Sequence, residues 1–260
     1  MSYPVEPYAR WCRRVTDASA LVGIVVWLVL RGPVAAGAES FVASIAESAV
    51  VLAVLVLVPL LLRLSLTEGV DGTLPVVYVV GVFLQPLAGL LVPFSFLLPE
   101  GPMAGVLVLP WLGVVACLTA FGLWRLLPRG TADTGEVAID AGLLYVPIGG
   151  VALLLHRLGL GFLQFGALLV LLAAMHFHFA GLTLPILSGV AARTLPDEGR
   201  IGAAVDAALW TIILGPVFIL VGITFSPAVE VVSVGFFTVA VAAFSLCVLF
   251  RGLPGRPRGQ

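Results

Sequence analysis

Two histidines lie two residues apart in a long apolar run, at positions 176 and 178 within "MHFHFAGLTLP" (Met175–Pro185). An imidazole can bind a transition metal, or take up and release a proton near neutral pH. Consecutive residues of a helix turn by ~100°, so that residues i and i+2 point to opposite sides. We therefore expect His176 and His178 to contact different neighbours rather than to chelate one metal ion between them.

Small residues and a proline surround His178. Ala174 and Gly181 share its face, and their size lets another helix approach closely. Pro185 has no N–H, which frees the carbonyl of Gly181 from its helical bond. In lipid this carbonyl needs a partner in the bundle or a wet cavity. We predict a binding site here, with Gly181 and Pro185 as a break in the helix. The alternative is that each histidine only hydrogen-bonds a neighbouring helix.

Further polar side chains interrupt other apolar segments. Ionisable groups inside a bilayer are costly and face a partner or water. We predict that four such residues join His176 and His178 in a substrate or ion site: Glu47, Gln85, Tyr145 and Asp206. A haem is disfavoured because the third histidine, His156, is expected near the outer edge with Glu47. A transition-metal site that combines a histidine with Asp206 or Glu47 stays open, and no other cofactor is implied.

The composition identifies the solvent of this chain as lipid. Of its 260 residues, 61% are hydrophobic and 10% are charged, against about 45–50% and about 25% in soluble domains. We expect a multi-pass protein of the cell membrane with the lipid bilayer as its first partner. No basic patch with interleaved aromatic residues is present, which argues against nucleic acid as a partner.

The apolar runs predict the elements that must position these residues. A spanning helix needs about 20 apolar residues. Eight segments qualify, at residues 15–33, 41–62, 73–95, 103–126, 137–156, 161–190, 201–224 and 228–250. The expected fold class is therefore an all-α, polytopic transmembrane helix bundle that forms a single membrane domain over residues 1–260. The uncharged run from Leu158 to Ala192 exceeds one span, so the sixth helix should be long and tilted or begin along the interface.

Arginines predict the orientation. With the N-terminus inside, eleven of the thirteen basic residues fall in inner segments. The outer segments then hold only Arg31 and Arg157. Basic residues favour the cytoplasmic side, so we predict that both termini lie inside. The first apolar run resembles a signal peptide, but Arg31 and Pro33 follow its core, and we interpret it as the first spanning helix.

One stretch resembles a known family. "HFHFAGLTLPILSG" (His176–Gly189) is similar to the signature of the YndJ-like family of prokaryotic membrane proteins, a His-Phe-His-Tyr-Ala-Gly core before an apolar run with a proline. Phe179 stands where that signature has tyrosine. Looser similarities are Glu47 followed by Val58-Pro59-Leu60, then Gln85-Pro86, Ser95-Phe96 and Pro110-Trp111-Leu112. The resemblance implies a polytopic membrane architecture and a transporter-like character, without a substrate.

Three functions are compatible with these patterns. The first is a small-molecule or ion transporter, coupled to protons through the histidines and carboxylates. The second is a membrane-embedded, metal-dependent enzyme that acts on a lipid or isoprenoid, with His176 or His178 as ligand or general base. The third is a non-catalytic assembly or sensor subunit. The sequence shows no G-x-S-x-G elbow, Walker loop or H-E-x-x-H pair, so common hydrolase and nucleotide chemistries lack support. The expected ligand is a small hydrophobic molecule or an ion, and the oligomeric state is open.

Overall fold

The structure is a computed structural model that describes residues 2–66, 73–195 and 199–251. Within them, eight helical segments are long and apolar enough to cross a membrane, which confirms the predicted bundle of eight spans. The helices are α1 (Val5–Gly37), α2 (Phe41–Leu52), α3 (Val58–Leu64), α4 (Val76–Phe96), α5 (Pro102–Arg129), α6 (Thr134–Arg157), α7 (Ala167–His176), α8 (Leu184–Ala192), α9 (Gly199–Phe225) and α10 (Pro227–Arg251).

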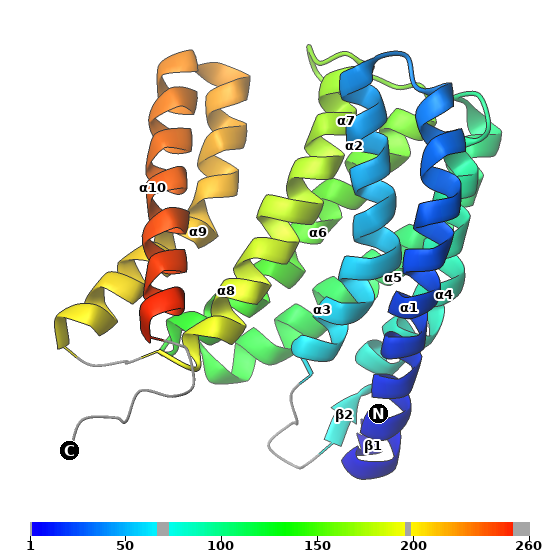
Figure 1. The fold of residues 1–260 in the computed structure, drawn as a ribbon. Coiled ribbons are helices and arrows are strands. Elements are labelled where there is room, and N and C mark those ends of the chain that lie inside the picture. The colour runs from blue at the N-terminus through cyan, green and yellow to red at the C-terminus, as the bar shows by residue number, and fades with distance from the viewer. Residues whose placement is uncertain (1, 67–72, 196–198, 252–260) are drawn as a thin grey trace.

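Most spans pack against their neighbours in the chain. α4 lies against α5, α5 against α6, and α9 against α10. Figure 1 shows that α1 to α8 form one bundle, while the α9–α10 pair leans to one side. This pair contacts the bundle chiefly through α9, which packs on α6 and α8. The start of α1 and the end of α10 lie at the same end of the bundle (Figure 1).

Two spans contain a short π-helical segment. The second span runs through α2, η1 (Ala53–Leu57) and α3, and the sixth runs through α7, η2 (Phe177–Thr183) and α8. A proline follows two residues after each segment, Pro59 after η1 and Pro185 after η2. A proline cannot donate the usual helical hydrogen bond, and the wider π turn accommodates the missing bond. Single π turns inside helices are frequent at functional sites.

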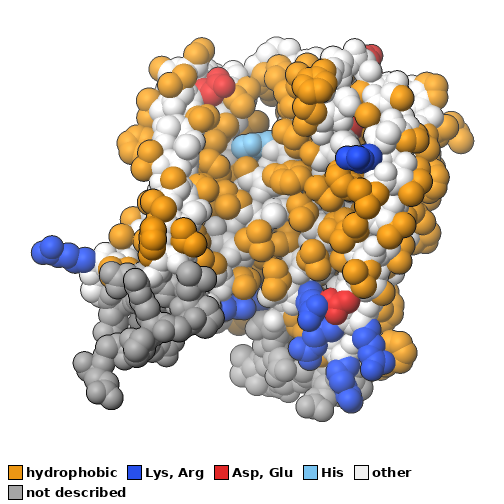
Figure 2. Space-filling model, viewed as in Figure 1, with side chains coloured by type: hydrophobic (Ala, Val, Ile, Leu, Met, Phe, Trp, Pro, Cys, Tyr) orange, Lys and Arg blue, Asp and Glu red, His pale blue; other side chains and the backbone are white. Residues whose placement is uncertain are grey.

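The interior is packed and the periphery is apolar. Four large aromatic side chains, Tyr78, Trp111, Phe121 and Phe177, are almost completely buried. Figure 2 shows hydrophobic side chains over most of the visible outer face, as expected for helices in contact with lipid. Glycine permits the closest helix contacts. A Cβ at Gly189 of α8 would overlap the carbonyl of Gly135 on α6, so any larger residue would push these helices apart.

The structure differs from the sequence prediction at three places. The first span was predicted to start at residue 15, but α1 begins at Val5. A two-stranded antiparallel ribbon, β1 (Ser2–Pro4) with β2 (Thr73–Pro75), accompanies the helices and was not predicted. The sixth span was predicted to start at residue 161 but begins at Ala167. Gly159 and Leu163 before it have φ values of 71° and 54°, a left-handed conformation that a helix cannot contain.

The two ends of the bundle differ in charge. The basic end holds the start of α1 and the ends of α3, α5 and α8, and Figure 2 shows arginine side chains gathered there. The acidic end holds the start of α2, the α4–α5 connection and the end of α6, with Glu39, Glu47 and Glu100. The N-in/C-in orientation stays a prediction that rests on this distribution.

Candidate functional site

A polar pocket of about 410 Å³ lies at the acidic end. It is enclosed by the start of α2, the α4–α5 connection, the end of α6 and the start of α7. Its charged and polar lining residues are Glu39, Ser40, Glu47, Glu100, His156 and Arg157. Glu47 is one of the predicted site residues, and His156 was expected near the same edge. The pocket therefore brings together polar groups from two spans that are far apart in the sequence.

Glu47 reaches this pocket because of how α2 begins. The hydroxyl of Ser40 accepts the N–H of Ala43 at 3.1 Å and caps the helix, which fixes its first turn. Residues i and i+7 lie on one helix face, so Ser40 and Glu47 both point into the pocket. The Glu47 side chain is only 7% exposed, and no ion pair or hydrogen bond joins it to the rest of the described chain. A buried carboxylate of this kind is costly unless a ligand or water compensates it.

His156 lies on the opposite wall, in the last turn of α6. It is 5% exposed, and its ring centroid lies 6.2 Å from that of Phe96. Nδ1 is 3.6 Å from Oε1 of Glu100, too long for a hydrogen bond. Neither ring nitrogen has a hydrogen-bond partner among the described residues. The ring also lies beside the backbone of Ala167. A neutral imidazole offers one donor and one acceptor, so at least one ring nitrogen remains available to a ligand.

Arg157 is largely occupied by the protein itself. Its Nη2 donates to the carbonyls of Ser95 and Leu98 at 2.9 and 2.7 Å. Its Cζ lies 4.9 Å from the ring centroid of Phe96, a cation–π distance. The guanidinium is 4.0 Å from Glu100. Arg157 therefore caps the end of α4 through Nη2, and its charge also acts on Glu47 across the pocket.

The basic end is closed by a network of five charged side chains. Arg125 and Asp140 are buried, and the Nε of Arg125 donates to Asp140 at 2.6 Å. Arg125 also reaches Glu136 at 2.7 Å and the carbonyl of Ser65 at 2.7 Å. The two remaining members each pair with a carboxylate of this network: Arg129 with Asp140, and Arg193 with Glu136. The network ties α3, α5 and α6 to the end of α8.

His178 is completely buried in the middle of the bundle. Its Nδ1 lies 2.7 Å from the carbonyl of Ala174. A carbonyl only accepts, so Nδ1 carries the proton and Nε2 is the acceptor in a neutral ring. Nε2 has no partner within the described chain. The ring stacks on Trp111 at 5.9 Å and faces Gly149 of α6, where a Cβ would come within 2.9 Å of Nδ1.

His176 has different neighbours, as the spacing predicted. Its ring lies beside the backbone of Pro216 on α9 and edge-on to Phe177 at 5.2 Å. Tyr145 connects α6 to the same helix α9, because its hydroxyl donates to the carbonyl of Ile213 at 2.8 Å. Tyr145 also lines the space next to Gly181, where a Cβ would meet the Tyr145 Cβ at 3.3 Å. These residues join α6, η2 and α9 into one contact.

Gln85 of α4 contacts the other π segment, η1. Its amide donates to the carbonyl of Val54 in η1 at 3.0 Å, and its oxygen accepts from Ser19 at 2.6 Å. In η2, the Thr183 hydroxyl donates to the carbonyl of His178 at 2.7 Å. Side chains thus satisfy carbonyls in both segments, as expected for a broken helix in lipid.

Asp206 is separate from the other predicted site residues. It lies on an exposed face of α9. Within the described ranges, no three His, Cys, Asp or Glu side chains are grouped so that they could hold a metal ion. The described residues therefore supply no group of three ligands that would hold a metal ion at His176 or His178.

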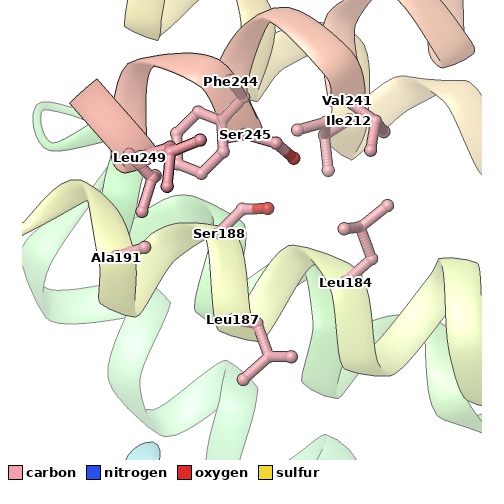
Figure 3. Close-up of a pocket in the computed structure, with 10 residues that line it drawn as sticks. Leu184, Leu187, Ser188, Ala191, Ile212, Val241, Phe244, Ser245 and Leu249 are labelled. Carbon is pink, nitrogen blue, oxygen red and sulfur yellow. The ribbon is translucent and has the colours of Figure 1, made fainter. Parts of the chain in front are cut away.

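Two apolar cavities lie beside α9. One, of about 430 Å³, is formed by α8, α9 and α10, and Figure 3 shows the hydroxyls of Ser188 and Ser245 facing each other across it. The other, of about 530 Å³, separates the α9–α10 pair from α6 and α7 and includes Ala173 and Leu220 in its lining. We call it the lateral groove. His176 and Pro216 lie one turn further along the same two helices, so their contact closes the lower end of this groove.

Sequence reasoning missed four polar residues of the pocket, Glu39, Ser40, Glu100 and Arg157. Arg157 was interpreted as a charge of an outer loop, and Glu100 was not considered. A usable signal was present, because His156 and Arg157 are adjacent at the end of a predicted span. Two consecutive titratable residues at such a position point to a shared polar environment.

The fold and the buried polar groups define an integral membrane protein with eight spanning helices and an intramembrane polar site. The chain belongs to the YndJ-like protein family, because the sequence model of this family matches residues 48–258. This range includes His156, Arg157 and the two central histidines, and it begins one residue after Glu47.

A relative from Bacillus subtilis (strain 168) bears the name "Uncharacterized membrane protein YndJ". It is 28% identical over 226 residues, and the match covers 84% of this chain and 38% of the relative. The chain thus spans well under half the length of that protein. No solved structure matches the chain.

Proposed function

We propose that this protein is a transporter that moves a small molecule or ion across the bilayer in exchange with protons. One observation carries the proposal: Glu47, His156 and Arg157 are each more than nine-tenths buried around a pocket at one end of the bundle, whereas the basic end is closed by the five-residue ion network. Alternating access requires a binding site that is open to one side of the membrane while the other side is closed.

The π segments support this function because they lie between the two ends. η1 and η2 interrupt the spans that contribute Glu47 and the start of α7 to the pocket. A helix bends most easily where its regular hydrogen bonds are missing. Bending there moves the upper halves of these spans without unpacking the lower halves. Glu47 and His156 supply groups that exchange protons, in the field of Glu39, Glu100 and Arg157.

The lateral groove favours a second function, an enzyme that acts on a lipid or isoprenoid. The groove is apolar, opens beside α9, and ends at His176. A hydrocarbon chain would fill it and bring a headgroup bond close to an imidazole, a common general base. In that case, His176→Ala would abolish turnover of the lipid and leave solute movement unaffected.

Solute movement is measured in proteoliposomes that contain the pH dye pyranine. Organic cations, carboxylates, sugars and alkali ions are added outside, one at a time. The expected result is that one class changes the internal pH, and that Glu47→Gln removes the change. The control is Glu230→Gln, a carboxylate at the start of α10, outside the pocket.

Access to the basic end is measured with a cysteine at Ser65, which is buried beneath the ion network. Cys12, Cys117 and Cys247 are first replaced by alanine. Asp140→Asn should raise labelling by an impermeant maleimide from the basic side several-fold. Asp17→Asn, which breaks an exposed ion pair with Arg63 at the same end, should not. Equal labelling in all variants, together with no solute-driven pH change, would contradict transport.

A further inference from the structure

We infer that the polar pocket at the acidic end binds its ligand through an alkylammonium group. This inference uses the same pocket as the proposed function and adds a ligand class to it. It rests on the charges of the lining, on the unpartnered polar groups that face the pocket, and on the apolar wall beside them.

The charges of the lining favour a cation. Three carboxylates line the pocket, those of Glu39, Glu47 and Glu100, against the single guanidinium of Arg157. Arg157 is engaged by two backbone carbonyls and the face of Phe96. An anionic ligand could reach only the Nε of Arg157, which has no hydrogen-bond partner among the described residues, and would be repelled by three carboxylates.

The acceptors in the pocket match the donors of a primary ammonium. Such a group carries three N–H bonds and needs three acceptors when it leaves water. The Glu47 carboxylate is buried and makes no hydrogen bond or ion pair to the described chain. His156 offers an unpartnered ring nitrogen, and Glu100 lies at the rim, 3.6 Å from it. One ammonium would satisfy both buried groups, Glu47 and His156. A carboxylate cluster at the surface would need no such ligand, because water solvates it.

A bare metal ion fits less well than an organic cation. The acidic groups and His156 are not grouped as metal ligands within the described residues. The pocket has a volume of about 410 Å³ and an apolar side formed by Ala43, Leu168 and Leu171. This wall suits the methylene groups of an alkyl chain, whose burial contributes about 0.8 kcal/mol per CH₂.

The test compares three probes on the full chain in detergent by titration calorimetry. They are n-butylammonium, tetramethylammonium, which has the charge but no N–H donor, and butyrate, which has the chain but the opposite charge. We expect n-butylammonium to bind at least tenfold more tightly than either of the others. Glu47→Gln, which keeps size and shape, should weaken its binding by about 10–100-fold, the range for loss of a buried charged hydrogen bond. Glu230→Gln should leave binding unchanged.

The ammonium can belong to a free amine or to an ethanolamine lipid headgroup. Nanodiscs of phosphatidylethanolamine and of phosphatidylglycerol distinguish these sources. If the headgroup is the natural ligand, n-butylammonium will bind to the protein in phosphatidylglycerol nanodiscs but not in phosphatidylethanolamine nanodiscs. If a free amine is the ligand, binding will be equal in both lipids.

Tighter binding of butyrate, or n-butylammonium binding that Glu47→Gln does not weaken, would overturn the inference. The wild-type probe comparison decides this even if a variant unfolds. Binding of n-butylammonium without any solute-driven pH change in proteoliposomes would instead reject transport and retain the ammonium site.

Discussion

The side-chain amide of Gln85 donates to the carbonyl of Val54 at 3.0 Å, and Val54 is the fifth residue before Pro59. In this π segment, the N–H of Val58 bonds to the carbonyl of Ala53, five residues earlier. The next donor in that pattern would reach Val54, but Pro59 has none. Gln85 therefore supplies from another span the hydrogen bond that the proline removes.

Gln85→Leu should lower the free energy of unfolding by about 1–3 kcal/mol, the cost of a buried carbonyl left without a donor. The measurement is reversible unfolding in mixed micelles, followed by far-UV circular dichroism. Gln164→Leu is the matched control, because its amide bonds to the Thr224 carbonyl in an exposed position. Equal effects of both variants would show that Val54 finds another donor.

His178→Ala should destabilise the protein by about 2–4 kcal/mol, because it removes a buried ring and the donor to Ala174. His176→Ala should have less than half of this effect, since its side chain is only partly buried. The same unfolding measurement applies. If His176→Ala is the more damaging variant, the structural role assigned to His178 is wrong.

Asp140→Asn should destabilise the protein by about 3–5 kcal/mol, because Arg125 then remains buried without its nearest carboxylate. Asp17→Asn breaks an exposed pair with Arg63, a type of contact that contributes about 0–1 kcal/mol. Urea or SDS titrations of both variants give the comparison. A small effect of Asp140→Asn would mean that Glu136 alone compensates Arg125.

Gly189→Ala should destabilise by about 1–3 kcal/mol through overpacking against Gly135. Gly32→Ala is the control, because a Cβ there meets nothing within 4 Å. It should change stability little or raise it slightly, since alanine is the better helix former. Thermal unfolding monitored by intrinsic fluorescence separates the two cases.

Reporter fusions at residue 1 and residue 260 should both place the reporter on the cytoplasmic side. The physical reason is the excess of arginines at the basic end, which holds the start of α1 and the end of α10. A phosphatase reporter that is active only outside the cytoplasm should therefore be silent at either terminus. Activity at one terminus and silence at the other would reject an even number of spans.

The eight spans could be predicted because lipid imposes a length and a composition on each of them. The buried state of Glu47 and the different neighbours of His176 and His178 also followed from local reasoning. The side of a helix to which a residue points can be read from the sequence, because consecutive residues turn by ~100°. The packing of α7 against both α2 and α6, which builds the polar pocket, is a tertiary contact that no sequence periodicity reports.

Asp206 illustrates the limit of reasoning from depth alone. As an ionisable residue within an apolar span it was predicted to join the histidines, but it lies on an exposed face. Which face of a uniformly apolar helix turns inward depends on close packing, as for Gly189 against Gly135. The ribbon of β1 and β2 was missed for a related reason, since three-residue strands carry no measurable alternation.

α7 separates two chambers of opposite character. Ala167, Leu168 and Leu171 face the polar pocket, whereas Val170 and Ala173 face the lateral groove. The partition is one helix thick and continues below into η2, where His176 and His178 lie on either side of the change from α- to π-helix. If α7 rotated about its axis during the proposed transport cycle, side chains would move from the polar pocket toward the apolar groove, and a ligand bound in one would change the shape of the other.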